Sequence, residues 1–256
     1  MLNEILAAAR DRAATAAAGS AAFRAAAADA DPPRDFLAAL TGPGLGIVAE
    51  IKRRSPSKGA LAPSLDPVRK AEAYVAGGAV AVSVLTEPHS FDGSLDDLVA
   101  VRRAVEVPVL RKDFLLDEAQ VWEARVAGAD AVLVIAAAVD DGLLVALMRA
   151  SADAGIAALV EVHDARELER AMAVGARLIG VNNRNLISFV TDLGVAEGLG
   201  SVLSGSDIVT IAESGVSDPR GAARMAAAGY DAILVGEAVV TADDPSGVIR
   251  SLQVGT

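Results

Sequence analysis

Residues 127–134 read Ala-Gly-Ala-Asp-Ala-Val-Leu-Val, a helix end at glycine followed by an apolar, strand-like run. Similar stretches occur at 76–84, 174–181 and 228–235. Glycine is common just past a helix end, and an apolar run without polar alternation is typical of a strand that is buried on both faces of a parallel sheet. The repeated pattern therefore predicts parallel strands joined by crossover helices.

The same interpretation, extended along the chain, predicts eight strands whose starts are about 21 to 33 residues apart, the length of a strand plus a crossover helix. Eight such units in 256 residues favour the α/β class and a (β/α)8 TIM barrel, as a single domain of residues 1–256. A doubly wound sheet would usually have fewer strands and a G-x-G-x-x-G loop after the first one, which is absent here. The predicted strands are 47–52, 80–85, 107–112, 131–136, 157–162, 178–182, 208–213 and 232–236.

An alanine-rich segment, residues 1–40, precedes the first predicted strand. Its apolar residues Leu2, Ile5 and Leu6 recur at helical spacing, and alanine is the strongest helix former. We therefore expect an N-terminal helical extension of one or two helices packed on the barrel.

Composition excludes several classes of partner and site. The chain has 23 basic and 34 acidic residues and a net charge of −11, which opposes binding to nucleic acid or to an anionic membrane. It has no cysteine, so disulfides and thiolate zinc sites are excluded. No apolar run reaches the length of a membrane span, and no targeting signal is recognisable. We expect a cytoplasmic monomer or weak oligomer.

Ionisable residues stand at the ends of the predicted strands. Active sites of (β/α)8 barrels lie at the C-terminal ends of the strands, where alternate strands contribute side chains to one layer. Buried charges are costly unless they are paired or used, so this set indicates a catalytic site, with mutual salt bridges as the structural alternative. The expected cluster is Lys52, Lys112, Glu161 and Glu213 from alternate strands, Glu50 one layer below, and Asn182 from strand 178–182.

Small and hydroxyl residues follow three of the strands and predict a phosphate site. Loops after the seventh and eighth strands commonly bind phosphate in this fold, through backbone N–H groups and a helix N-terminus. Ordinary strand-to-helix turns are the alternative. The residues concerned are Ser55 after the first strand, Ser214 and Gly215 after the seventh, and Gly236 and Glu237 after the eighth.

These motifs resemble those of the indole-3-glycerol phosphate synthase family, and the resemblance covers nearly the whole chain. The most specific motif is Ile-Val-Ala-Glu-Ile-Lys-Arg-Arg-Ser-Pro-Ser-Lys-Gly at 47–59, followed by Gly-Val-Asn-Asn-Arg-Asn-Leu at 180–186. Supporting motifs are Ser-Val-Leu-Thr-Glu-Pro (83–88), Phe-Asp-Gly-Ser-Leu (91–95), Pro-Val-Leu-Arg-Lys-Asp-Phe (108–114), Leu-Val-Glu-Val-His (159–163), Ala-Glu-Ser-Gly-Val (212–216) and Leu-Val-Gly-Glu-Ala (234–238).

The resemblance implies that 1-(2-carboxyphenylamino)-1-deoxyribulose 5-phosphate closes its ring, loses carbon dioxide and water, and becomes indole-3-glycerol phosphate. It implies that Lys112 is the general acid on the ribulose carbonyl and that Lys52 and Glu161 serve the later dehydration. Glu50, Asn182 and Glu213 would orient the substrate and keep the lysines charged.

The resemblance also implies a set of substrate contacts. Ser55, Gly215 and Gly236 would bind the phosphate, and Arg184 would help Asn182 to steer the anthranilate carboxylate or the loop. Two departures from the family pattern are the alanine-rich start and Glu237 beside the phosphate loop. The apolar seat for the anthranilate ring would consist of Phe91, Phe114, Leu133 and Leu186, for each of which a core role is the alternative.

No cofactor or metal is expected, because positioned acids and bases suffice for this chemistry. The two histidines are interpreted as non-ligands, with His89 in a loop and His163 on the outward face of strand 157–162. A Schiff-base aldolase that uses Lys112 as its nucleophile is a competing enzyme. A phosphate-binding barrel without turnover is the alternative from another class.

Overall fold

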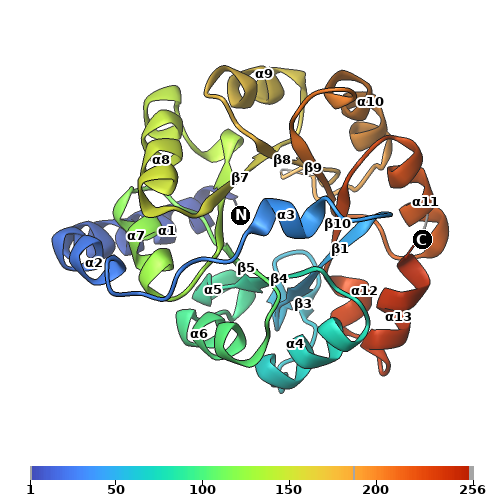
Figure 1. Ribbon diagram of the computed structural model, residues 1–256, viewed down its shortest axis with the longest axis horizontal. Helices are drawn as coiled ribbons and strands as arrows, with labels where there is room; N and C mark the ends of the chain where they lie inside the picture. Colours follow the sequence, from blue (N-terminus) through green and yellow to red (C-terminus); the bar gives the residue numbers. More distant parts are fainter. Residues whose placement is uncertain (1, 187, 254–256) are drawn as a thin grey trace.

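The computed structural model describes residues 2–186 and 188–253, with side chains from residue 4. Eight of the strands in this part of the chain are parallel and form a closed barrel in the order β1-β10-β9-β8-β7-β6-β5-β4 (Figure 1). The predicted (β/α)8 barrel is thereby confirmed. The strands are β1 (Gly46–Ile51), β4 (Ala81–Leu85), β5 (Val109–Lys112), β6 (Ala131–Ile135), β7 (Ala157–Val162), β8 (Leu178–Asn182), β9 (Val209–Glu213) and β10 (Ala232–Val235).

The limits of β7 and β8 are the predicted ones, and those of the other strands differ by one or two residues. The predicted strand 107–112 begins only at Val109, immediately after Pro108, which has no N–H to donate to a neighbouring strand. The predicted strand 131–136 ends at Ile135, because the next three residues form the short 3-10 helix η1 (Ala136–Ala138). A small antiparallel pair, β2 (Arg54–Ser55) and β3 (Gly59–Ala60), occupies the loop after β1 and was not predicted.

Helices surround the barrel on its outer face (Figure 1). Several begin at an aspartate or serine whose side chain accepts a hydrogen bond from the first turn, the usual N-cap arrangement; Asp164, for example, accepts from the backbone N–H of Glu167. No helix in the described ranges is long and apolar enough to cross a bilayer. The helices are α4 (Pro67–Ala76), α5 (Pro88–Phe91), α6 (Leu95–Ala104), α7 (Ala119–Val126), α8 (Asp141–Ala154), α9 (Ala165–Ala173), α10 (Gly194–Leu203), α11 (Pro219–Ala227), α12 (Glu237–Val240) and α13 (Pro245–Leu252).

Three helices precede β1: α1 (Leu2–Ala18), α2 (Ser20–Ala27) and α3 (Phe36–Leu40). Helix α3 lies across one end of the ring of strands (Figure 1), where Phe36 and Leu40 pack on residues of the barrel interior. Helix α1 instead contacts α5 and α7 on the side of the barrel. The alanine-rich segment is therefore helical, and its helices pack on the barrel at two separate places.

Candidate active site

A cavity of about 540 Å³ opens at the C-terminal ends of the strands. This size is in the range of small-molecule sites. Every residue predicted for catalysis or substrate binding lines it: Lys52, Lys112, Glu161, Glu50, Asn182, Glu213, Ser55, Phe91, Phe114, Leu133, Arg184, Leu186, Ser214, Gly215, Gly236 and Glu237. The strand ends thus gather one set of side chains from nearly the full length of the sequence.

Lys112 occupies the centre of the ionisable cluster. Its ammonium Nζ lies 3.4 Å from Oε2 of Glu161 and 3.4 Å from Oε2 of Glu213. Burial alone would lower the pKa of Lys112, but the charges of Glu213, Glu161 and Glu50 raise it well above its ordinary value. The Lys112 side chain is therefore charged at neutral pH and can donate a proton to an oxygen in the cavity.

Lys52 and Glu50 form a second ion pair, with 2.6 Å between Nζ of Lys52 and Oε1 of Glu50. Burial would raise the pKa of Glu50, but Lys52 and Lys112 lower it below its usual range. A Cβ atom at Gly236 would overlap Oε1 of Glu50 and lie 2.7 Å from Nζ of Lys52. The pair therefore occupies space that only glycine at position 236 leaves open.

The pKa values of the two carboxyl groups beside Lys112 shift in opposite directions. Burial would raise the pKa of Glu161, but Lys112, His163 and Asn182 hold it far below its ordinary value. Burial raises the pKa of Glu213 to about 8, because Glu161 and Glu50 add to the effect and outweigh the opposing charge of Lys112. Both oxygens of Glu213 are buried without a hydrogen-bond partner in the described residues. The surroundings therefore favour the ionised form of Glu161 and shift Glu213 toward its protonated form.

Small residues and two loop contacts form a rim of the cavity. Gly215 has a φ of 87°, which favours glycine, and a Cβ atom there would lie 2.5 Å from Cγ2 of Thr191. The loop after β1 is attached to its neighbours by Lys58, whose Nζ is 2.5 Å from Oε1 of Glu237, and by Ser57, whose hydroxyl accepts from Arg184. Glu237 therefore pairs with a lysine of the loop that carries Ser55.

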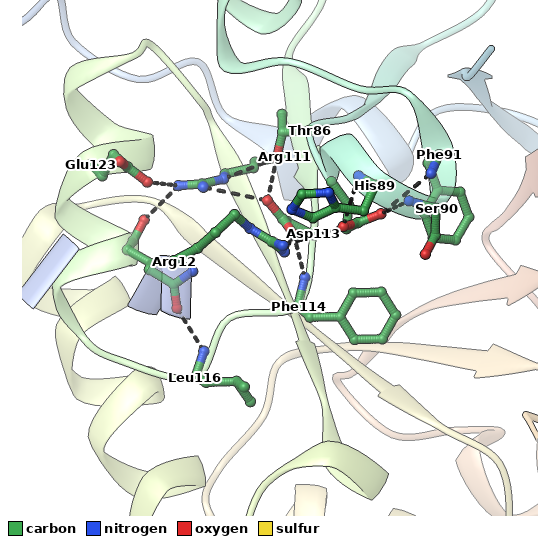
Figure 2. A network of polar contacts seen from close by, with 12 residues as sticks. Arg12, Thr86, His89, Ser90, Phe91, Arg111, Asp113, Phe114, Leu116 and Glu123 are labelled. Atoms are coloured by element: carbon green, nitrogen blue, oxygen red, sulfur yellow. Dashed lines mark hydrogen bonds and ion pairs between the residues drawn. The ribbon is translucent and has the colours of Figure 1, made fainter. Parts of the chain in front are cut away.

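The apolar wall of the cavity is the predicted seat of Phe91, Phe114, Leu133 and Leu186. A polar network that was not predicted from the sequence supports this wall. Arg12 of α1 donates to Glu87 and Asp113 over 3.2 and 2.8 Å. Both carboxylates are buried, and both accept from backbone N–H groups of the wall, Glu87 from Phe91 and Asp113 from Phe114 (Figure 2). The N-terminal extension thus contributes to the support of the two aromatic residues of the cavity.

The prediction for the orientation of His163 was wrong. Its ring does not face outward: Nε2 lies 3.3 Å from Oε1 of Glu161, and Nδ1 lies 3.0 Å from Oε2 of Glu167. His163 lies just beyond the last residue of β7, so strand alternation does not set the direction of its side chain, and the ring packs between Glu161 and Glu167 instead. Among the described residues, no group of three or more His, Cys, Asp or Glu side chains is arranged to hold a metal ion.

The family model for indole-3-glycerol phosphate synthase matches residues 2–252. The enzyme of this name from Mycobacterium ulcerans (strain Agy99) is 48% identical over 234 residues, which cover 91% of this chain and 86% of the relative. Its counterpart from Nocardioides sp. (strain ATCC BAA-499 / JS614) is 50% identical over 230 residues, covering 90% and 88%.

Solved structures are similar to this chain in fold. The 3-hexulose-6-phosphate synthase of Salmonella typhimurium has a TM-score of 0.66 and 16% identity, over 81% of this chain and 96% of that one. Such an identity indicates a shared barrel only, whereas the sequence matches extend from the N-terminal helices to α13. The chain belongs to the indole-3-glycerol phosphate synthase family.

Proposed function

We propose that the cavity binds 1-(2-carboxyphenylamino)-1-deoxyribulose 5-phosphate between its apolar wall and its small-residue rim. As a member of this family the protein is a carboxy-lyase of tryptophan biosynthesis. The anthranilate ring would pack on Phe91, Phe114, Leu133 and Leu186, and the phosphate would lie at Ser55, Ser214, Gly215 and Gly236. Asn182 and Arg184 would orient the carboxylate that is later lost.

Lys112 would catalyse the first step. The ring carbon that bears the carboxylate attacks the ribulose carbonyl carbon, and the oxygen takes the proton of the ammonium group and becomes a hydroxyl. Carbon dioxide then leaves, and its bonding electrons restore the aromatic ring. The single observation that carries this assignment is the partly buried Lys112 ammonium between two carboxylates in the predicted cavity.

Lys52 and Glu161 would serve the dehydration that follows. The hydroxyl leaves as water with a proton from an acid, and a base takes the proton that remains, so that the indole forms. Glu50 holds Lys52, and Glu213 lies beside Lys112, which fits the orienting roles expected for these two carboxylates.

A Schiff-base aldolase is disfavoured by the same geometry. Imine formation needs an unprotonated amine, and the carboxylates around Lys112 raise its pKa. We therefore expect borohydride treatment with substrate to leave the protein unmodified.

The direct test is turnover of the aminodeoxyribulose phosphate, followed by indole fluorescence. We expect product formation that is unchanged after exhaustive EDTA treatment, because the proposed steps use only side-chain acids and bases. Absence of turnover by folded protein would favour the phosphate-binding barrel instead. Loss of activity on chelation that a divalent ion restores would contradict the metal-free mechanism.

Binding is expected to depend on the phosphate dianion. An analogue that lacks the phosphate should bind at least about tenfold more weakly, since one hydrogen bond to a charged group contributes about 1.5 kcal/mol or more. Titration of both analogues by quenching of anthranilate fluorescence would measure the difference. Equal affinities would show that the rim at Ser55, Gly215 and Gly236 is not the phosphate site.

Assembly and location remain part of the proposal. The exposed large apolar side chains belong to different elements: Val126 to α7, Met172 to α9, Val190 to the loop after β8, and Val202 to α10. This scatter favours a monomer or weak oligomer. We assign the protein to the cytoplasm, where phosphorylated biosynthetic intermediates are found.

A further inference from the structure

His163 lies between two carboxylates at the end of β7. Its Nδ1 is 3.0 Å from Oε2 of Glu167, and its Nε2 is 3.3 Å from Oε1 of Glu161. Nε2 is buried and has no hydrogen-bond partner in the described part of the chain. The Glu161 carboxylate is therefore the polar group that this nitrogen faces.

The positions of the two carboxylates define the protonation of the ring. A neutral imidazole has one N–H donor and one acceptor nitrogen, whereas the imidazolium ion has two donors. An ionised carboxylate only accepts, so a neutral ring would direct a lone pair at one of the two glutamates. The geometry therefore favours a doubly protonated, charged His163.

Glu167 holds the ring from a rigid position. It lies in the first turn of α9, where its backbone N–H donates to the N-cap residue Asp164 over 2.9 Å. Its Oε2 also accepts from the backbone N–H of His163 over 2.9 Å. Both the backbone and the ring of His163 are thus fixed by one carboxylate of the helix.

The other side of the ring faces the residues assigned to chemistry. Glu161 uses Oε1 toward His163 and Oε2 toward Lys112, 3.3 and 3.4 Å away. Asn182 also lowers the pKa of this carboxyl group. Without His163, Oε1 would lose its charged partner, and the Glu161 side chain could turn away from Lys112.

We propose that His163 is a positioning residue of the reaction, whose charged ring holds the Glu161 carboxylate beside Lys112 through the ion pair between Nε2 and Oε1 while Glu167 anchors the ring from behind. This inference rests on the proposed function, because it acts through Glu161 and Lys112. It assigns a task to a histidine that the resemblance left without one.

The electrostatics agree with this geometry. Burial alone would lower the pKa of His163, but Glu161 from β7 and Glu167 from α9 raise it to about 10. Because this value lies above the 6.5 of a free imidazole, the stability that the charged ring contributes is complete below pH 6.5. It is lost as the pH rises from there through about 10.

The first experiment measures the ring directly and does not need activity. The chain has two histidines, so His89→Gln leaves His163 as the single imidazole, whose proton resonances can be titrated by NMR. We expect a midpoint well above 6.5 that falls on Glu161→Gln and on Glu167→Gln. A midpoint near 6.5, or one that Glu161→Gln leaves unchanged, would overturn the proposal.

The second experiment measures what the ring does for the reaction. His163→Leu should lower kcat about 10- to 100-fold, the usual cost of removing a group that orients an active-site residue, with KM changed less than about threefold. His163→Gln, whose amide nitrogen replaces Nε2–H, should recover most of the lost turnover. His89→Gln is the control, because the His89 side chain is exposed, and it should behave as wild type.

A pH profile separates positioning from general damage to the fold. Glu167→Gln should move the alkaline limb of kcat to lower pH, because the ring loses its proton earlier when one carboxylate is neutral. A kcat of Glu167→Gln that is lowered equally at all pH values would contradict the inference, and so would a wild-type kcat for folded His163→Leu. If the wild-type protein shows no turnover, the proposed function fails, and the NMR titration still decides whether His163 and Glu161 are coupled.

Discussion

Replacement of Lys112 by methionine is expected to reduce turnover at least about a hundredfold, the scale of general-acid catalysis, while the fold and substrate binding persist. Methionine keeps most of the volume of the lysine stem and removes the proton donor. The neutral side chain leaves Glu161 and Glu213 close together, and burial, which raises the pKa of Glu213 to about 8, favours the protonated form that relieves their repulsion. Steady-state kinetics and substrate titration on the same preparation measure both effects.

Lys70→Met is the matched control for this substitution. Lys70 belongs to α4, outside the cavity, and its ammonium donates to the backbone carbonyl of Val240. The same change of side chain should leave turnover near the wild-type value. Near wild-type turnover of Lys112→Met would refute its role as the acid, and an unfolded Lys112→Met protein would show that the lysine is structural.

Gly180→Ala is expected to lower kcat on the order of a hundredfold, the usual effect of misplacing a catalytic group by about 1 Å. Gly180 lies in β8 next to Ile211 of β9, and a Cβ atom there would overlap Oε1 of Glu213. The overlapping atom is the end of a flexible side chain, so the backbone can stay in place while the carboxylate turns away from Lys112. The expected result is a folded protein with a displaced Glu213.

Gly198→Ala provides the comparison for this prediction. Gly198 is exposed in α10, and a Cβ atom there would meet nothing within 4 Å. Alanine in an exposed helix should leave activity unchanged and stabilise the fold by up to about 1 kcal/mol. Circular dichroism and kcat would be measured for both variants. Wild-type kcat in folded Gly180→Ala would show that the position of Glu213 is not critical.

The barrel and most of the cavity could be predicted from residue order alone. Stretches such as 127–134, in which a helix ends at a glycine before a strand, indicate the local conformation. Their spacing leaves few ways to connect the parallel strands. The alternation of side chains along a strand then places Glu50 and Lys52 on one face. Because all the parallel strands end at the same side of the barrel, Lys112 and Glu161 meet there. These properties depend on residue order along single elements, which is why they could be predicted.

The ion pairs that support the cavity depend on the tertiary structure alone. Arg12 reaches Glu87 and Asp113 across 75 and 101 positions of the chain, and Lys58 meets Glu237 across 179. Such pairs depend on how separate elements pack, and no periodic pattern marks them in an alanine-rich helix or a polar loop. His163 is the intermediate case: its position two residues after Glu161 follows from the sequence, whereas the direction of its ring, predicted as outward, and its charged state depend on how α9 places Glu167 against the ring.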